Sequence, residues 1–190
     1  MKLNEAIQLE EGISPVLYHA TSLNNFIGMA NSNKIKLSRD PTMKGRFYMS
    51  FSRNKTNDFI PYLKSLSNFD LEEENFNPRN DAFAVIEFDG RQLGYNYSGR
   101  AFNTFYVPDD EDDPLENPNF MEDRLYNNKP YIENARRYIR SISIVTNGKR
   151  ITQSAKTMFS RLASHFGQVL VYDDVIDYIR LNKPIETYTR

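Results

Sequence analysis

A nearly continuous apolar run at residues 82–90, AFAVIEFDG, places the strongest constraint on the fold of this chain. A run of this kind that ends at a turn-forming Asp-Gly pair is typical of a strand buried inside a sheet. Shorter strands are expected at 16–20, 35–37, 122–126, 141–146 and 168–173, and helices at 22–33, 58–66, 131–140, 151–166 and 174–183. Short strands and helices mixed in this order predict an α+β fold.

The segment at residues 46–52, RFYMSFS, is a strand of a different kind, because apolar and polar side chains alternate along it. One predicted face carries Phe47, Met49 and Phe51. The other carries Tyr48, Ser50 and Ser52. The polar face is a candidate for binding, since a phenol and two hydroxyls offer a stacking surface and several hydrogen bonds.

The composition limits the chemistry that the chain can carry. Its 190 residues favour a single domain, and 13 Phe and 12 Tyr offset an apolar share of only 39% in building the core. With 24 basic against 25 acidic residues, no overall charge draws the chain to nucleic acid or to a membrane surface. The absence of Cys excludes disulfides, thiolate metal sites and a Cys nucleophile, and two isolated His predict no metal site.

Residues 17–22, LYHATS, hold one of the two histidines, and the other, His165, is expected to be a structural or surface residue of a helix. Residues two apart on a strand share a face, so His19 and Thr21 are expected to project together. If this strand lies beside 46–52, an imidazole, a phenol and hydroxyls line one cleft suited to a planar amide and a ribose. The polar face of any half-buried strand alternates in the same way, so a purely structural interpretation stays open.

In three places the chain resembles the ADP-ribosyltransferase superfamily, in the branch with a His-Tyr-Glu triad. LYHATS followed by a helix is similar to the first motif, in which a strand carries His and, two residues on, Ser or Thr. GRFYMSFSRNKTNDF, residues 45–59, is similar to the second motif, an aromatic strand that bears Tyr and leads into a helix. FMEDRL, residues 120–125, is similar to the third, a strand that begins with the catalytic Glu after a variable loop. The resemblance implies the split mixed or antiparallel sheet of that superfamily, with flanking helices.

The resemblance also implies NAD as the substrate and a role for each matching residue. His19 and Thr21 are expected to hold the adenosine ribose, and Ser50 or Ser52 to brace the neighbouring strand. The implied activity is mono-ADP-ribosylation of a protein or a nucleic acid, without a metal.

Tyr48 and Glu122 are the expected catalytic partners of His19. The ring of Tyr48 is expected to stack on nicotinamide, and Glu122 to bind the 2′-hydroxyl of the nicotinamide ribose. A carboxylate there stabilises the oxocarbenium-like transition state, because positive charge develops on the ribose as nicotinamide leaves. Glu87 and Glu116 are rival carboxylates, and the segment 122–124 also fits a structural ion-pair cluster.

Two other functions are compatible with the sequence. The first is an inactive binding or inhibitor protein that keeps the fold and uses the acidic residues 109–116 as its binding surface. The second is a nuclease with His19 as base and Arg124 as phosphate anchor. The nuclease is supported by fewer residues, since a single His has no second acid–base partner at a matching spacing.

Residues 1–12 are expected to form a helical segment or a propeptide before a single domain at 13–190, which carries an exposed acidic loop at about 108–119. LEEG, residues 9–12, is similar to the Leu-x-Glu sites that head-maturation proteases of large tailed phages cut, here after Glu11. That likeness implies a phage protein that is packaged in the head and injected to act on the host. No apolar run approaches the ~18 residues of a spanning helix, and no signal peptide is present, so the host cytoplasm is the expected location.

Overall fold

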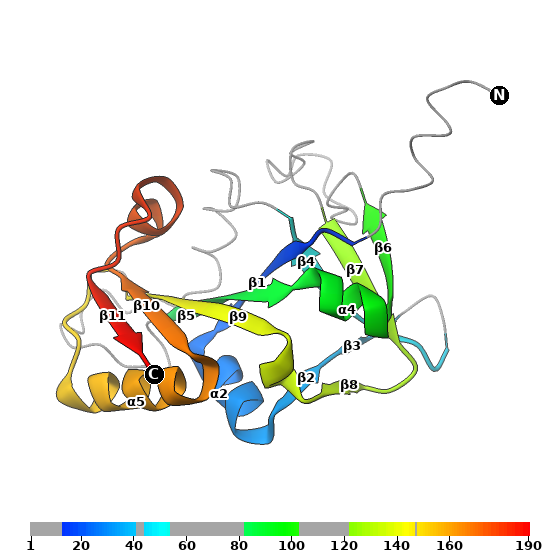
Figure 1. The fold of residues 1–190 in the computed structure, drawn as a ribbon, viewed down its shortest axis with the longest axis horizontal. Coiled ribbons are helices and arrows are strands. Elements are labelled where there is room, and N and C mark those ends of the chain that lie inside the picture. The colour runs from blue at the N-terminus through cyan, green and yellow to red at the C-terminus, as the bar shows by residue number, and fades with distance from the viewer. Residues whose placement is uncertain (1–12, 41–43, 54–81, 103–121, 147) are drawn as a thin grey trace.

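The structure is a computed structural model and describes residues 13–40, 44–53, 82–102, 122–146 and 148–190. Within these ranges the strands form one nine-stranded sheet and a separate two-stranded sheet. The large sheet has the strand order β11-β10-β9-β5-β1-β4-β7-β6, with β3 paired to β4, and the small sheet pairs β2 with β8 (Figure 1). The expectations for residues 1–12, for a helix at 58–66 and for the loop at 108–119 lie outside the described residues.

The strands are β1 Val16–Ser22, β2 Lys34–Lys36, β3 Ser38–Arg39, β4 Phe47–Ser52, β5 Phe83–Asp89, β6 Ser98–Phe102, β7 Glu122–Asn127, β8 Tyr131–Glu133, β9 Ile139–Val145, β10 Gln168–Tyr172 and β11 Glu186–Thr189. The helices are α2 Leu23–Ser32, α4 Gly90–Asn96 and α5 Gln153–Phe166, with a 3-10 turn η1 at Ala135–Arg137 and a π-helical turn η2 at Asp177–Leu181. The expected strands, and the expected helices at 22–33 and 151–166, are confirmed to within a few residues.

The apolar run at 82–90 forms β5, the centre of the large sheet. β5 lies between β1 and β9 and is antiparallel to both. Phe83, Ile86 and Phe88 have no exposed surface. A strand with a partner on each side satisfies its backbone hydrogen bonds, and cover on both faces buries consecutive side chains. The prediction of a buried central strand is confirmed.

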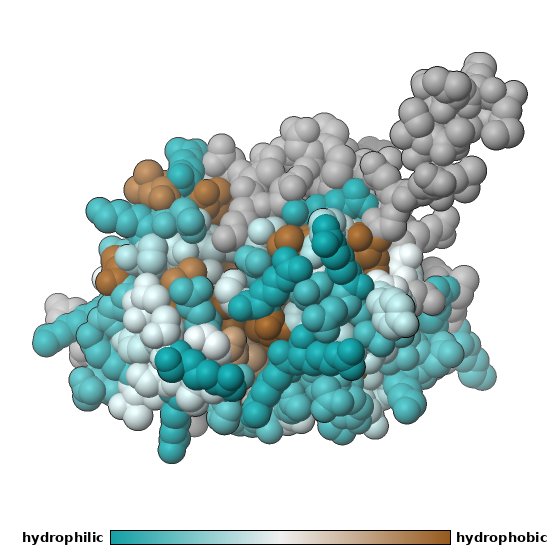
Figure 2. Space-filling view, viewed as in Figure 1, coloured by the Kyte–Doolittle hydropathy of each residue, from teal (hydrophilic) through white to brown (hydrophobic). Residues whose placement is uncertain are grey.

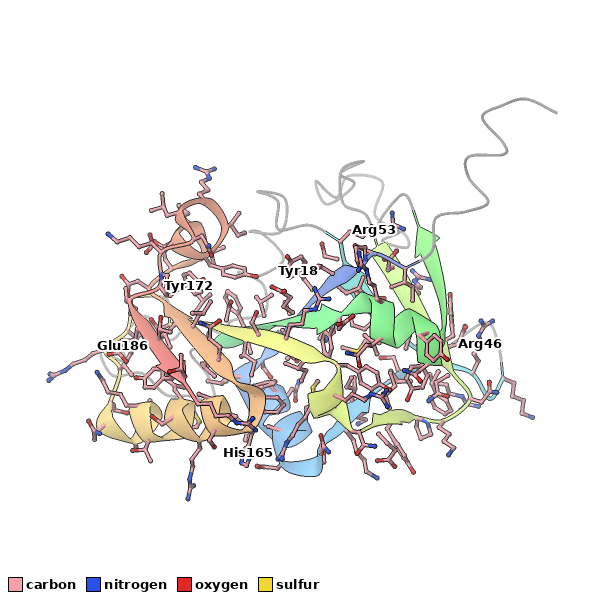
Figure 3. The ribbon with its side chains drawn as sticks, in the orientation of Figure 1. Tyr18, Arg46, Arg53, His165, Tyr172 and Glu186 are labelled. Atoms are coloured by element: carbon pink, nitrogen blue, oxygen red, sulfur yellow. The ribbon has the colours of Figure 1, made fainter. Side chains whose placement is uncertain are left out.

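Helices α2 and α5 cover one face of the large sheet, and η2 covers part of the other (Figure 1). On the first face, called the α2/α5 face, Phe26 packs against Phe166 with ring centroids 5.5 Å apart. On the second, called the η2 face, Tyr172 meets Tyr178 edge-on at 5.2 Å. Tyr18 and Tyr172 both lie on the η2 face (Figure 3). Successive residues of each strand therefore alternate between a helix-covered core and a more open face.

The side of the molecule shown in Figure 2 is largely hydrophilic, with apolar side chains gathered over η2. Ile176, Leu181 and Ile185 are the exposed large apolar residues of this region. Exposed apolar side chains in small numbers are normal on a protein surface. Within the described ranges, no helix combines the length and the apolar character needed to cross a membrane.

The expected helix at 131–140 is wrong, because this segment contains β8, the η1 turn and the start of β9. Ile132 is fully buried opposite Ile35 in the small sheet, so tertiary pairing overrides the helical spacing of the apolar residues. Asn134 follows with a left-handed backbone, φ 59°, which ends the strand and blocks a continuous helix.

The turn expected at Asp89-Gly90 is instead the start of helix α4. The carboxylate of Asp89 caps this helix by accepting a hydrogen bond from the backbone N–H of Gln92 at 3.0 Å. Gly90 is required by a close approach, since a Cβ there would lie 1.8 Å from the carbonyl oxygen of Ser14. The close packing of Gly90 against Ser14 therefore requires a glycine at the start of α4.

A buried ion pair joins three separate segments near the ends of β1, β4 and β7. Asp123 has no exposed surface, and Arg53, labelled in Figure 3, has a side chain that is 11% exposed. The Nε of Arg53 donates to Oδ1 of Asp123 at 2.7 Å, and its Nη2 lies 2.7 Å from the same oxygen. The other carboxylate oxygen accepts from the backbone N–H of Ser14 at 2.8 Å. The segment 122–124, which also fitted a structural ion-pair cluster, thus contributes Asp123 to a pair with Arg53, the residue that follows β4.

Asp123→Ala is expected to lower the free energy of unfolding by about 3–5 kcal/mol, because it removes a buried carboxylate that binds both Arg53 and the backbone N–H of Ser14. Urea denaturation followed by circular dichroism measures this. Glu133→Ala is the matched control, since Glu133 pairs with Lys34 at 3.2 Å through side chains that are 52% and 41% exposed. Its loss is expected to cost less than about 1 kcal/mol. Equal losses in the two variants would contradict the role given to Asp123.

Candidate functional site

The large sheet splits between β1 and β4. These strands are antiparallel but share one register pair, Tyr18 with Ser52, and both extend beyond it without another. The side chain of His19 bridges the gap, with Nδ1 3.0 Å from the backbone carbonyl oxygen of Ser50. The imidazole thus donates to a carbonyl oxygen that would accept from a backbone N–H in a continuous β ladder. The split sheet implied by the superfamily resemblance has its opening at this histidine.

The contact with Ser50 fixes the tautomer of His19. Because a carbonyl oxygen only accepts, Nδ1 carries the proton and donates, which leaves Nε2 as an acceptor. The ring packs edge-on against Phe51, with centroids 6.0 Å apart. Burial lowers the pKa of His19, and the hydrogen bond to Ser50 opposes part of that effect. The imidazole is therefore neutral at pH 7 and presents one acceptor nitrogen.

A cleft with a volume of about 1240 Å³ lies on the α2/α5 face beside this split. His19 and Thr21 both line it, which confirms that they project together. A cleft of this size is large enough for a dinucleotide. Helix α2 contributes Asn24, Asn25 and Gly28, and the β2–β3 segment contributes Lys36, Ser38 and Arg39.

The described lining of the cleft carries positive charge and no carboxylate. Lys34 is ion-paired to Glu133 at 3.2 Å and stands 4.3 Å from the centroid of the Tyr131 ring. The side chains of Lys36 and Arg39 are exposed, and within the described ranges neither has an ion-pair partner. A concave surface with this charge and with amide and hydroxyl groups favours a polar, anionic ligand. No cluster of metal-binding side chains occurs in the part of the chain that the structure describes.

The structure does not bring Tyr48 into this cleft. Met49 lines the cleft, so the residue before it projects from the opposite face of β4. There the ring of Tyr48 lies 6.4 Å from that of Tyr126, its register partner on β7. The guanidinium carbon of Arg124 is 5.4 Å from the centroid of the same Tyr48 ring. The single cleft expected for the imidazole and the phenol is therefore divided between the two faces of β4.

The other predicted residues lie around the split. The carbonyl of Ser50 supports His19, and Ser52, 5% exposed, is buried at the pair that joins β4 to β1. Glu122 is the first residue of β7 and occupies the register position opposite Ser52. Because neighbouring strands are ~4.8 Å apart, the backbone of Glu122 is roughly 10 Å from that of Tyr18.

The remaining candidates lie elsewhere. His165 is exposed on α5, in agreement with a surface role. Glu87 lies on β5, where the hydroxyl of Ser141 donates to its carboxylate at 3.4 Å, and register places it opposite Tyr18 on the η2 face. Glu116 and the acidic residues 109–116 lie outside the described ranges.

Several polar residues of the cleft were not predicted as site residues, among them Asn24, Asn25, Lys36 and Arg39. The two asparagines carried a signal, because they fall in the first turn of the helix that directly follows LYHATS. The two cations carried none. Their position depends on β2 pairing with β8 and β3 pairing with β4, which local patterns do not reveal.

No protein-family model matches the chain, and no curated protein matches its sequence. Its fold is nevertheless similar to that of DarT, an ADP-ribosyltransferase. DarT from Thermus sp. 2.9, solved in complex with NAD+, matches with a TM-score of 0.50 over 85% of this chain and 96% of that chain, at 10% identity. The complex of that protein with carba-NAD+ matches with a TM-score of 0.46 over 80% and 90%, also at 10% identity. The first match confirms the expected α+β core, a mixed sheet with flanking helices.

The low pKa of His19 predicts a pH dependence of stability. Below the ordinary histidine pKa of 6.5, the unfolded chain binds a proton at His19 more readily than the folded protein does. The contribution of His19 to the free energy of unfolding is therefore complete above pH 6.5. This contribution is lost as the pH falls through the lower pKa that His19 has in the folded state. The free energy of unfolding is therefore expected to fall more steeply between pH 7.5 and 5 in the wild type than in His19→Gln, whose amide still donates to Ser50. Denaturant titrations at several pH values measure this, and parallel curves would contradict it.

Proposed function

We propose that this protein is an NAD-dependent mono-ADP-ribosyltransferase. One observation carries the proposal: the neutral imidazole of His19 and the hydroxyl of Thr21 line a dinucleotide-sized cleft at the split of the sheet. The likeness of the fold to DarT, which was solved with NAD+, supports it. A fold by itself does not determine a function, so the residues of the cleft carry the proposal.

His19 and Thr21 bind the adenosine ribose in this proposal. The Nε2 atom of His19 accepts a hydrogen bond from a ribose hydroxyl, and the hydroxyl of Thr21, on the same strand face, bonds the same sugar region. The exposed cations of the β2–β3 segment favour the pyrophosphate electrostatically. The contact of His19 with Ser50 holds the ring in place before the ligand arrives, which reduces the entropy lost on binding.

Glu122 stabilises the transition state in the proposed reaction. The bond between C1′ of the nicotinamide ribose and the ring nitrogen breaks, and nicotinamide leaves with the electron pair. A nucleophilic atom of the acceptor bonds to C1′ and gives up its proton. A carboxylate near C1′ acts most strongly while the ribose is positively charged, which is the condition for catalysis. The support is the position of Glu122 at the start of β7, two strands from β1.

Stacking of Tyr48 on nicotinamide requires the nicotinamide end of NAD+ to reach the far face of β4. Its ring is on the far face of β4, against Tyr126, while the ribose-binding residues line the near face. The nicotinamide end therefore has to pass through the split between β1 and β4 to reach it. The bracing role of Ser50 is supported by its carbonyl contact to His19, and that of Ser52 by its burial at the joining pair.

The acceptor in this proposal is a host protein or nucleic acid, and the enzyme is phage-encoded, packaged in the head and released into the host cytoplasm. The support for these parts is the sequence LEEG alone. Cleavage after Glu11 in mature particles, seen by mass spectrometry, is the observation that would support packaging.

His19→Ala is expected to weaken NAD+ binding at least tenfold, because it removes the acceptor nitrogen and the contact that bridges β1 and β4 at the split. Isothermal titration calorimetry measures the dissociation constant, where tenfold is about 1.4 kcal/mol. The matched control is His165→Ala, since the only other histidine is exposed on α5. Unchanged NAD+ affinity in His19→Ala, with normal folding, would contradict the proposed site.

Glu122→Gln is expected to leave NAD+ affinity within about threefold and to slow nicotinamide release by about 10²–10³, the usual effect of losing one electrostatic group at a transition state. Nicotinamide release from labelled NAD+ in the presence of host lysate measures the rate. Glu186→Gln serves as the control, because Glu186 lies on β11 at the other end of the strand order and pairs with Lys156. Wild-type rates in Glu122→Gln would remove Glu122 from the mechanism, and no release by the wild type would remove the proposed activity.

A further inference from the structure

Residues 13–15, called the N-terminal strap, cross the large sheet from β6 to β1. A Cβ on Gly99 of β6 would lie 1.6 Å from Cδ1 of Ile13, so the strap packs directly on that strand. One residue further on, the backbone N–H of Ser14 donates to Oδ2 of Asp123 on β7 at 2.8 Å. Because the strand order is β1-β4-β7-β6, the strap spans β4 and joins strands that are not neighbours (Figure 1).

The strap supplies a connection that the sheet itself lacks. β4 is paired with β7 along its whole length, whereas β1 and β4 share the single register pair Tyr18–Ser52. β1 in turn is paired along its whole length with β5. Two well-paired parts of the sheet, β5 with β1 and β4 with β7, therefore meet at one register pair. The backbone ladder alone defines their relative position only weakly.

Asp123 binds the strap and the end of β4 at the same time. Its side chain is fully buried, with Oδ2 accepting from Ser14 and Oδ1 accepting from Nε of Arg53, the residue after β4, at 2.7 Å. A buried ion pair often stabilises a fold no more than apolar residues of the same volume would. Its short and directional hydrogen bonds do, however, define one geometry for the groups that make them. The carboxylate thus ties the chain leading into β1, the end of β4 and the start of β7 to one another.

This cluster lies next to the residue to which the proposed reaction assigns the transition state. Glu122 directly precedes Asp123 in the sequence, and Ser52, the register partner of Glu122, directly precedes Arg53. Ser52 is also the residue that pairs with Tyr18 of β1. A change in the geometry of the ion pair therefore moves the backbone of Glu122 with respect to β1.

We propose that Asp123 and Arg53 are positioning residues which, together with the strap, set the distance between Glu122 and the ribose-binding face of β1. This proposal rests on the proposed function, because it assumes that Glu122 acts on NAD+ held at His19 and Thr21. The ion pair acts through the backbone of Glu122 and not on the substrate. Since a misplacement of about 1 Å at a reacting group costs roughly 10²-fold in rate, the effect falls on turnover and not on binding.

Two conservative variants of the full chain test the positioning role. Arg53→Lys keeps the positive charge but loses the pair of nitrogens that contact one carboxylate oxygen, and Asp123→Asn keeps the shape of the side chain but has one oxygen instead of two. Each is expected to lower kcat for nicotinamide release at least about tenfold while the dissociation constant for NAD+ stays within about threefold of the wild type. Steady-state release with host lysate and calorimetry measure the two quantities. Glu186→Gln is the matched control, because it removes the ion pair with Lys156 on β11 and is expected to change neither.

Combination with Glu122→Gln separates positioning from a general loss of structure. If the ion pair acts only through the carboxylate of Glu122, adding Arg53→Lys or Asp123→Asn to Glu122→Gln is expected to lower the remaining rate by less than about twofold. A further loss as large as the loss in the wild-type background would overturn the proposal, because the pair would then act independently of Glu122.

The remaining outcomes distinguish this proposal from the proposed function. No nicotinamide release by the wild type overturns both. Release that depends on Glu122 but is unchanged in Arg53→Lys and Asp123→Asn overturns the positioning role alone. Loss of NAD+ binding in both single variants, or of their cooperative thermal unfolding, also overturns it, because the pair would then be needed for the whole fold and not for the placement of Glu122.

Discussion

The hydrogen bond from Nδ1 of His19 to the carbonyl of Ser50 is the interaction on which the site depends. It replaces part of a β ladder with a side chain, so β1 and β4 stay attached while the sheet opens beside them. Burial keeps the imidazole neutral because it disfavours the charged form, and the bond to Ser50 places the proton on Nδ1, so that Nε2 is the acceptor. The contact thus attaches β1 to β4 beside the cleft and determines which ring nitrogen of His19 can accept a hydrogen bond from a ligand. The buried Asp123–Arg53 pair supports these strands by joining the end of β4 to the start of β7 and holding both against Ser14, which precedes β1.

Much of the fold was predictable because it depends on local patterns. The continuous apolar run at 82–90 became the central strand, and the alternation of 46–52 became β4 with the expected two faces. The segment 131–140 could not be predicted in the same way. Its apolar spacing fits a helix, but Ile132 pairs with Ile35 across a sheet that joins distant parts of the chain. A left-handed Asn134 then separates it from β9.

The site was predictable only in part, for a physical reason. His19 and Thr21 were expected to project together because two residues apart on one strand share a face, and both line the cleft. Whether Tyr48 shares that face depends on the register between β1 and β4, in which a shift of one residue exchanges the faces. The actual register, Tyr18 with Ser52, places Tyr48 on the opposite side. Lys36 and Arg39 enter the cleft through strand pairings that no short motif encodes.

A crystal structure of this protein with a non-hydrolysable NAD+ analogue would show whether NAD+ binds beside His19. The analogue is expected on the α2/α5 face, with a hydroxyl of its adenosine ribose within hydrogen-bonding distance of Nε2 of His19. An analogue bound wholly on the far face of β4, with no contact to His19, would contradict this binding mode. So would an analogue whose ribose lies away from His19 within the same cleft.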